Sequence, residues 1–407
     1  MTSGWLVRCL ALLLAWRMRA ACWAFVAVTQ PQRPVGRTAR RVRERRQPRP
    51  RARMEQRSTE GEGCTPARVI TRRITQAVSA SQVLDIMQAE QENPNMDLIA
   101  VATAWTRLAQ LQRSINAETT NSPAFLMLVC LTGSLLERPA GLARAVANIF
   151  WAAARLHGSM SPQLAALWPS LARAIRTTVN DLNAQGVANV IWAVAKLANA
   201  GIEVVLGLLP VLAARVPAVI SEMIEQHVSN VIWATGQLSV EPFRSGVARS
   251  LREALPDLVA RAGVLLPTAK PQAIGNICWG MALCGYYDDV LFGAVAARVT
   301  NEAAGWSHAD VELNLSWVLC ALARLKATGH QDLMDTAAKI LPPMLSKISD
   351  WSLCALSWSF QQLDSGNFDT FRQSLEAEVT SRGIPEDDVE RSRFGPETWK
   401  QANQRHK

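Results

Sequence analysis

The stretch NVIWAVAKLA, from Asn189 to Ala198, places an asparagine and a lysine in an otherwise apolar run. The same pattern recurs as NIFWAAARL, NVIWATGQL, NICWGMALC and NLSWVLCAL, which begin at Asn148, Asn230, Asn276 and Asn314. A sixth copy, ALSWSFQQL, begins at Ala355 and keeps the tryptophan without the asparagine. The tryptophans of the six copies are Trp151, Trp192, Trp233, Trp279, Trp317 and Trp358.

These tryptophans are 41, 41, 46, 38 and 41 residues apart. A period near 40 residues accommodates two helices and two turns, which is the size of a helical-hairpin repeat. The segments between the copies are helical patterns rich in Leu, Val and Ala without β-type alternation, so the sequence predicts an all-α fold. We expect a right-handed α-solenoid over residues 65–388, with one degenerate repeat around residues 100–111 and six recognisable ones.

Prolines fall within the helices expected between the tryptophan copies. They should kink or shorten those helices, because proline lacks the amide proton that a helix interior needs. We expect these helices to form the outer, less regular layer. The prolines concerned are Pro210, Pro217, Pro256, Pro342 and Pro343.

A narrow polar stripe runs along each tryptophan-bearing helix. With about 100° per residue and the tryptophan at zero, the positions three before, four after and seven before it lie at about 60°, 40° and 20°. We call these positions the polar strip; stacked repeats would turn them into a polar track bordered by tryptophans. The candidate RNA-binding residues on it are Arg144, Asn148, Arg155, Gln185, Asn189, Lys196, Gln226, Asn230, Gln237, Gln272, Asn276 and Asn314.

Two interpretations of the recurring asparagine remain open. It either satisfies a backbone group between layers, since a buried amide without partners costs about 1–3 kcal/mol, or it faces a ligand. The tryptophan column is interpreted as packing between repeats, because a buried Trp contributes a large apolar area. The positions seven before and four after the tryptophan vary between repeats, as a reader of one ligand segment per repeat requires.

The net charge of +9 comes from the amino-terminal leader. Residues 1–57 hold 14 of the 43 Lys and Arg residues and only Glu44 and Glu55, which leaves 29 basic against 32 acidic residues in the rest. An apolar stretch followed by an Arg-rich, acid-poor segment is typical of an organelle-targeting presequence. Interrupting arginines keep every apolar run there below the ~18 residues of a membrane span, so we expect no stable membrane insertion. A disordered basic arm that binds RNA is the alternative.

No catalytic or cofactor motif is present. The sequence contains no H-E-x-x-H, P-loop or G-x-S-x-G pattern, and its five histidines are scattered, with His157 and His227 interpreted as satisfied polar or cap residues. The eight cysteines form no C-x-x-C pair and are interpreted as reduced core thiols. We therefore expect no enzyme, no metal, no cofactor and no small-molecule substrate.

At LNAQGVANVIWAVAKLA, Leu182–Ala198, the sequence resembles the octotricopeptide repeat proteins and the related FAST kinase-domain-type helical-repeat proteins of organelles. The segment from Ile74 to Leu111 is similar to the amino-terminal unit of these proteins, and the resemblance extends to about Asp388. It implies an α-solenoid that binds organellar transcripts. After Gly383 no RAP-type module is recognisable, so the nuclease-like activity linked to such modules is not implied.

Taken together, these features predict a single-stranded RNA-binding protein of a chloroplast (a complex plastid) or mitochondrion, acting in RNA processing, stability, translation or rRNA maturation. Other proteins of a ribonucleoprotein complex are possible partners. The alternative is a protein-binding scaffold of the armadillo or HEAT kind, favoured by the near-neutral repeat region. We expect three parts: a leader at 1–57, the solenoid at 65–388 and a polar tail at 389–407.

Overall fold

The computed structural model describes residues 66–139, 141–240, 246, 248–363 and 366–395. Within these ranges the regular elements are all helical and no β-strand occurs, which confirms the all-α prediction. The expected leader lies outside the described residues, as do residues 396–407 of the expected tail. Residues 389–395 of that tail belong to the folded chain, because they complete a short α-helix and a 3₁₀ turn.

One series of helices carries the tryptophan copies. Each member packs against the next, from α2 through α4 to α19. We call α7, α9, α11, α14, α17 and α19 the tryptophan helices. The series consists of α2 (Pro66–Gln76), α4 (Leu98–Gln110), α7 (Ala143–Leu164), α9 (Ala184–Asn199), α11 (Glu225–Gln237), α14 (Pro271–Cys284), α17 (Ser316–Leu325), which follows α16 (His308–Asp310) and the π-helical turn η8 (Val311–Leu315), and α19 (Asp350–Leu363).

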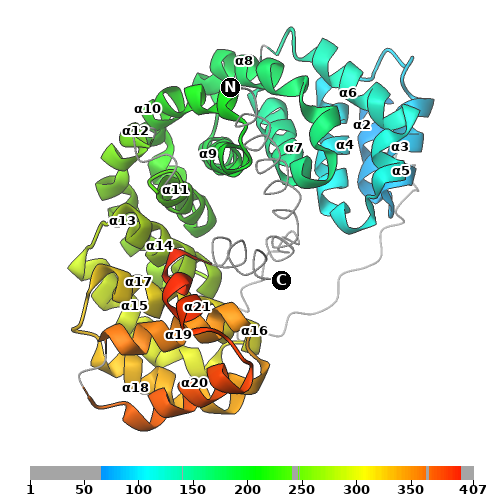
Figure 1. Cartoon of the computed structure of the whole chain (residues 1–407). Helices are drawn as coiled ribbons and strands as arrows, with labels where there is room; N and C mark the ends of the chain where they lie inside the picture. Colours follow the sequence, from blue (N-terminus) through cyan, green and yellow to red (C-terminus); the bar gives the residue numbers. More distant parts are fainter. Residues whose placement is uncertain (1–65, 140, 241–245, 247, 364–365, 396–407) are drawn as a thin grey trace, which may run out of the picture.

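A second series of helices alternates with the first along the chain. In Figure 1, α8, α10 and α12 follow the outside of a curved arc, and α9 and α11 lie on its inside. The second series consists of α3 (Ala80–Ala89), α5 (Ala117–Asn121), α6 (Pro123–Leu135), α8 (Leu167–Thr178), α10 (Leu209–Val219), α12 (Arg249–Glu253), α13 (Leu255–Leu265), α15 (Asp289–Glu302), α18 (Gln331–Ile340) and α20 (Asp369–Ser381).

Short 3₁₀ segments link the two series, and α21 (Glu386–Arg391) ends the described helices. Pro217 lies inside α10, Pro210 and Pro256 occupy first turns, and α18 gives way to a 3₁₀ helix at Pro342 and Pro343, as the missing amide protons require. The 3₁₀ segments are η2 (Gln112–Ser114), η3 (Val179–Asp181), η4 (Glu203–Leu208), η5 (Ile220–Glu222), η6 (Leu266–Thr268), η7 (Ala303–Gly305), η9 (Pro342–Lys347) and η10 (Ser392–Phe394).

Small residues let neighbouring tryptophan helices approach closely. A Cβ placed on Gly236 of α11 would lie 2.6 Å from the carbonyl oxygen of Gly280 in α14, and one placed on Gly280 would lie 2.5 Å from that of Ile232. The two backbones are therefore in direct contact at this crossing. Side chains at these two positions would have to push the helices apart.

Arginines of the outer series tie it to the turns that precede the tryptophan helices. The Arg215 guanidinium donates from Nε and Nη2 to the Leu182 carbonyl oxygen, both at 3.1 Å. Arg261 donates in the same way to Met223, at 3.1 and 2.8 Å. Two further arginines act alike on nearby carbonyls: Arg298 on Leu266, and Arg382 on Ile348 and Leu345. We call this set the arginine ladder; its charges hold adjacent helices together.

The segment Glu203–Glu222, which spans η4, α10 and η5, is long and apolar enough to cross a membrane by length and composition. Its buried residues include Val205, Leu208, Leu212 and Val216, and it packs against α9. It also carries Arg215 of the arginine ladder. In this structure one face of the segment packs into the helical array, with 39% of its apolar window buried.

Among the described residues five cysteines occur, and all are free. Cys278, Cys284, Cys320 and Cys354 are buried, whereas Cys130 is exposed. Burial raises the pKa of the Cys278 and Cys320 thiols to about 12. The buried four therefore behave as small apolar residues of the core.

Candidate nucleic-acid interface

The polar strip of α9 is the part of that helix that reaches the surface. The helix begins after Asn183, whose side chain accepts a hydrogen bond from the Gly186 amide at 2.9 Å. Only Gln185, Asn189, Lys196 and the terminal Asn199 are not buried. The rest of α9 is enclosed by α7, α10 and α11. The surface that α9 offers to a ligand is therefore narrow and polar.

The same positions reach the surface on three neighbouring helices. In α7, Arg144 is exposed and Asn148, Trp151 and Arg155 are half-buried. The half-buried members on α11 and α14 are Gln226, Asn230, Gln237, Gln272 and Asn276. Because α7, α9, α11 and α14 pack in that order, these side chains form one row across four helices.

The side chains of Asn148, Asn189, Asn230 and Asn276 make no hydrogen bond to another residue that the structure describes. Each is half-buried, so its amide is partly shielded from water and still reaches the surface. An internal ladder of asparagines would require hydrogen bonds to neighbouring layers, and these four lack them. Their amide donors and acceptors are available to a ligand.

Two tryptophans of the row carry a cation over the ring. The Arg155 guanidinium carbon lies 5.6 Å from the Trp151 ring centre, and the Lys196 ammonium lies 5.3 Å from that of Trp192. In both pairs the cation lies four residues after the tryptophan, so the two side chains are neighbours on the helix surface. Both distances are within the range of a cation–π interaction. Burial lowers the pKa of the Arg155 guanidinium from its ordinary value. The ring faces of Trp151 and Trp192 are therefore in contact with the cations of the strip.

The row ends at Asn314, which is buried, with 4% of its surface exposed. Its Nδ2 donates to the Asp310 carboxylate at 3.3 Å, and its Oδ1 lies against Gly275 of α14. A regular helical wheel places it on the strip, but the π-helical turn η8 inserts an extra residue there and rotates the side chain. Asn314 therefore has an internal role and is no part of the exposed strip.

His157 is buried and lies two residues after Arg155, the last strip position of α7. Burial, and then the positive charge of Lys196, lower its pKa to about 4. Its ring makes an edge contact with Trp168 at 5.6 Å between ring centres. His157 is therefore neutral at physiological pH and belongs to the core between α7 and α8.

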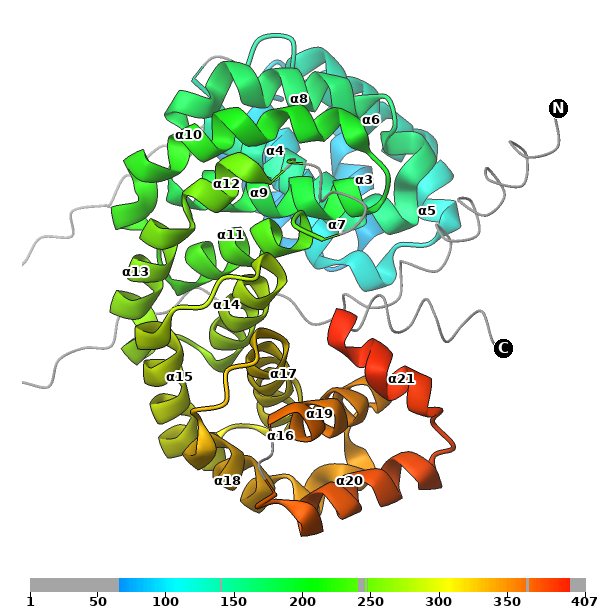
Figure 2. The ribbon, with the colours of Figure 1, turned by 60° about the vertical axis from the view of Figure 1, so that its left-hand side comes forward.

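A carboxy-terminal segment lies against the last tryptophan helices. We call Glu386–Gly395, which comprises α21 and η10, the C-terminal strap; Figures 1 and 2 show α21 beside α19. Trp351 donates from Nε1 to the Ser392 carbonyl at 3.3 Å, and Arg324 donates to the Arg393 carbonyl at 3.0 Å. No signal in the repeats indicated this contact.

The strap also contacts the ring of Trp279, through Gly395. A Cβ on Gly395 would lie 3.0 Å from Cζ2 of the Trp279 ring. Trp317 lies between the two other indoles of this row, 4.6 Å from Trp279 and 5.1 Å from Trp351 between ring centres. Trp192, Trp233, Trp279 and Trp358 are buried, and Trp151 and Trp317 are half-buried. The tryptophans are thus largely packing residues.

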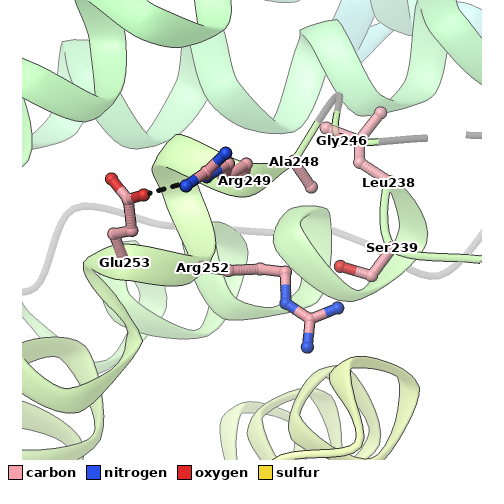
Figure 3. Close-up of a pocket in the computed structure, with 7 residues that line it drawn as sticks. All are labelled: Leu238, Ser239, Gly246, Ala248, Arg249, Arg252 and Glu253. Carbon is pink, nitrogen blue, oxygen red and sulfur yellow. Dashed lines mark ion pairs between the residues drawn. The ribbon is translucent and has the colours of Figure 1, made fainter. Parts of the chain in front are cut away.

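A separate pocket of about 420 Å³ lies between the end of α11 and α12. Figure 3 shows Arg249 paired with Glu253, at 3.4 Å. Arg252, at the same pocket, donates to the Cys284 carbonyl at 2.9 Å. Its arginines are thus engaged within the protein, and none of the lining residues belongs to the polar strip.

Among the residues with described positions, no group of three or more His, Cys, Asp or Glu side chains gathers as a metal site would require. No protein-family model and no curated protein matches this chain.

Proposed function

We propose that this protein is a right-handed α-solenoid of helical hairpins of about 40 residues whose polar strip binds single-stranded RNA. Its place of action is an organelle, plastid or mitochondrion, as the composition of the leader suggests, and its role is in processing, stability or translation of transcripts or in rRNA maturation. The role is one of binding, without catalysis, cofactor or stable membrane insertion. Other proteins of a ribonucleoprotein complex are further partners.

The observation that carries this proposal is the row of asparagine amides. Asn148, Asn189, Asn230 and Asn276 come one from each of four adjacent helices and have no side-chain hydrogen bond within the described chain. An amide presents both donors and an acceptor, which suits the edge of an unpaired base. One amide per layer supports reading one base per repeat, as in other helical-repeat RNA-binding proteins.

The cations of the strip supply the phosphate contacts. Arg144, Arg155 and Lys196 lie on α7 and α9, whereas Arg215 and Arg261 of the outer series are used in the arginine ladder. About three phosphate contacts give a slope of log K against log salt of about −2 for a single strand. Binding is therefore weakly salt-dependent and relies on the amides for much of its strength.

Fluorescence anisotropy with labelled single-stranded RNA at several salt concentrations tests the proposal. Replacing Asn148, Asn189 and Asn230 together by alanine should weaken binding and leave the salt slope near −2. Replacing Arg155 and Lys196 by glutamine should reduce the slope to about −0.7.

Matched controls come from the outer series. Asn301→Ala on α15 and Arg173→Ala on α8 change exposed residues of the same types away from the strip, and both should bind as the unmodified protein does. Equal affinity of the triple asparagine variant and its control would refute the assignment of the strip.

A protein-binding scaffold is the second candidate, and one observation favours it. The C-terminal strap is a peptide that lies against α17 and α19, beside the strip, and is held through its carbonyls at Ser392 and Arg393. A surface that holds its own peptide has the geometry to hold another. In that case the first tryptophan helices would bind an extended peptide, and RNA would bind the strip variants as well as the unmodified protein.

A further inference from the structure

The strap contacts three consecutive tryptophan helices at the tryptophan or close to it in direction. Trp351 lies seven residues before Trp358, Trp279 is itself the repeat tryptophan, and Arg324 lies seven residues after Trp317. Positions seven apart on a helix differ by about 20° in direction. On α14, α17 and α19 the strap therefore lies along the tryptophan column, which borders the polar strip that reaches the surface on α7, α9 and α11.

The chemistry of the strip changes where the strap begins. The residue four after the tryptophan is Arg155, Lys196 and Gln237 on the first three tryptophan helices, Leu283 and Ala321 on α14 and α17, and the exposed Gln362 on α19. Leu283 and Ala321 are buried. Apolar residues at these positions suit a surface that is covered by the protein itself, and polar ones suit a surface left for a ligand.

Arginines of the strap form ion pairs with acidic residues of the strap: Arg391 with Asp387 and Asp388 at 3.2 and 2.9 Å, and Arg393 with Glu390. Attachment of the strap to the tryptophan helices includes its main-chain carbonyls, the buried Val389 and the fit of Gly395 on Trp279. Gly395 has φ +92°, a conformation that favours glycine, so this seat depends on that residue.

We propose that the C-terminal strap is a built-in end stop of the RNA track, which confines bound RNA to α7, α9, α11 and the beginning of α14. This inference rests on the proposed function. The covered half holds the row of Trp279, Trp317 and Trp351, and indoles of this kind stack on bases when they are free. Release of the strap therefore lengthens the bound RNA segment and strengthens binding of long RNA.

The test compares the unmodified protein with Gly395→Val, which places a β-branched side chain at φ +92° and against Trp279. Gly366→Val is the matched control, because Gly366 has φ +100° and nothing within 4 Å of an added Cβ. Trypsin cleavage after Arg391 and Arg393, followed by mass spectrometry, reports strap release without RNA. A chain ending at Gly383 provides a second form without the strap, and circular dichroism verifies that each form is folded.

Affinity is then measured against single-stranded oligonucleotides of increasing length. For the unmodified protein and Gly366→Val, affinity should stop rising at a shorter length than for the two strap-free forms, which should bind the longest RNA about tenfold more tightly or better. If the strap is released and affinity still stops rising at the same RNA length as for the unmodified protein, this inference is overturned and the proposed function is not. If no form binds RNA of any length, the proposed function fails and this inference fails with it.

Discussion

The contact between α11 and α14 gives the most direct prediction about the fold. In the variant Gly280→Ala, the new Cβ would lie 2.5 Å from the Ile232 carbonyl oxygen and 2.8 Å from the Trp233 amide nitrogen. These are backbone atoms of a helix, so no side-chain rotation relieves the overlap. The two helices must separate by about 0.5 Å or more, which forfeits a quarter to a half of each contact energy across the crossing.

Two opposing terms decide the size of the effect. Overpacking a well-packed crossing costs about 1–3 kcal/mol, and the upper end applies because three backbone atoms are met at once. Replacing glycine by alanine inside a helix stabilises by about 1 kcal/mol. We expect Gly280→Ala to lower the free energy of unfolding by about 2 kcal/mol.

Gly293→Ala on α15 is the control, because it also lies inside a helix and has nothing within 4 Å of an added Cβ. It should raise the free energy of unfolding by about 1 kcal/mol. Urea unfolding, followed by both circular dichroism and tryptophan fluorescence, measures the two variants side by side. If Gly280→Ala were as stable as Gly293→Ala, the backbones of α11 and α14 would not be in contact, which would contradict the packing at this crossing.

Two further predictions concern pH and the arginine ladder. The pKa of His157 is lowered to about 4 in the folded protein, so as the pH falls the imidazole takes up its proton in the unfolded state first. Up to about 3 kcal/mol of stability is therefore lost between about pH 6.5 and 4. The variant His157→Phe should lack this part of the pH dependence when its free energy of unfolding is measured in urea. Arg215→Ala should cost about 1.5–3 kcal/mol, since two charged hydrogen bonds to the Leu182 carbonyl are lost, whereas the exposed Arg173→Ala should change stability by less than about 0.5 kcal/mol in the same assay.

The repeated N-x-x-W pattern was sufficient to predict the helices of α7 to α14 and the directions of their polar positions. The periodicity of an apolar helix with one polar stripe fixes which side chains reach the surface, and Gln185, Asn189 and Lys196 do so on α9. Asn314 departs from this pattern because the π-helical turn η8 changes the residue count per turn. A wheel that assumes regular geometry has no means of detecting such a turn.

Contacts between distant segments were not predictable in this way. The strap joins Gly395 to Trp279 across more than two repeats, and no sequence period links them. The arginine ladder did leave a signal, since Arg215 and Arg261 each lie 18 residues before a repeat tryptophan. The close approach of Gly236 and Gly280 left a weaker signal in the sequence: small residues recur one and three places after the tryptophan.

The central claim is that the polar strip of the first tryptophan helices binds RNA. Ultraviolet crosslinking of the tagged protein in cells, with sequencing of the attached RNA and mass spectrometry of the crosslinked peptides, tests it most directly. We expect organellar transcripts crosslinked to peptides from residues 143–158, 184–199 and 225–237. RNA recovery no greater than from the triple asparagine variant, or crosslinks confined to peptides outside these helices, would contradict it.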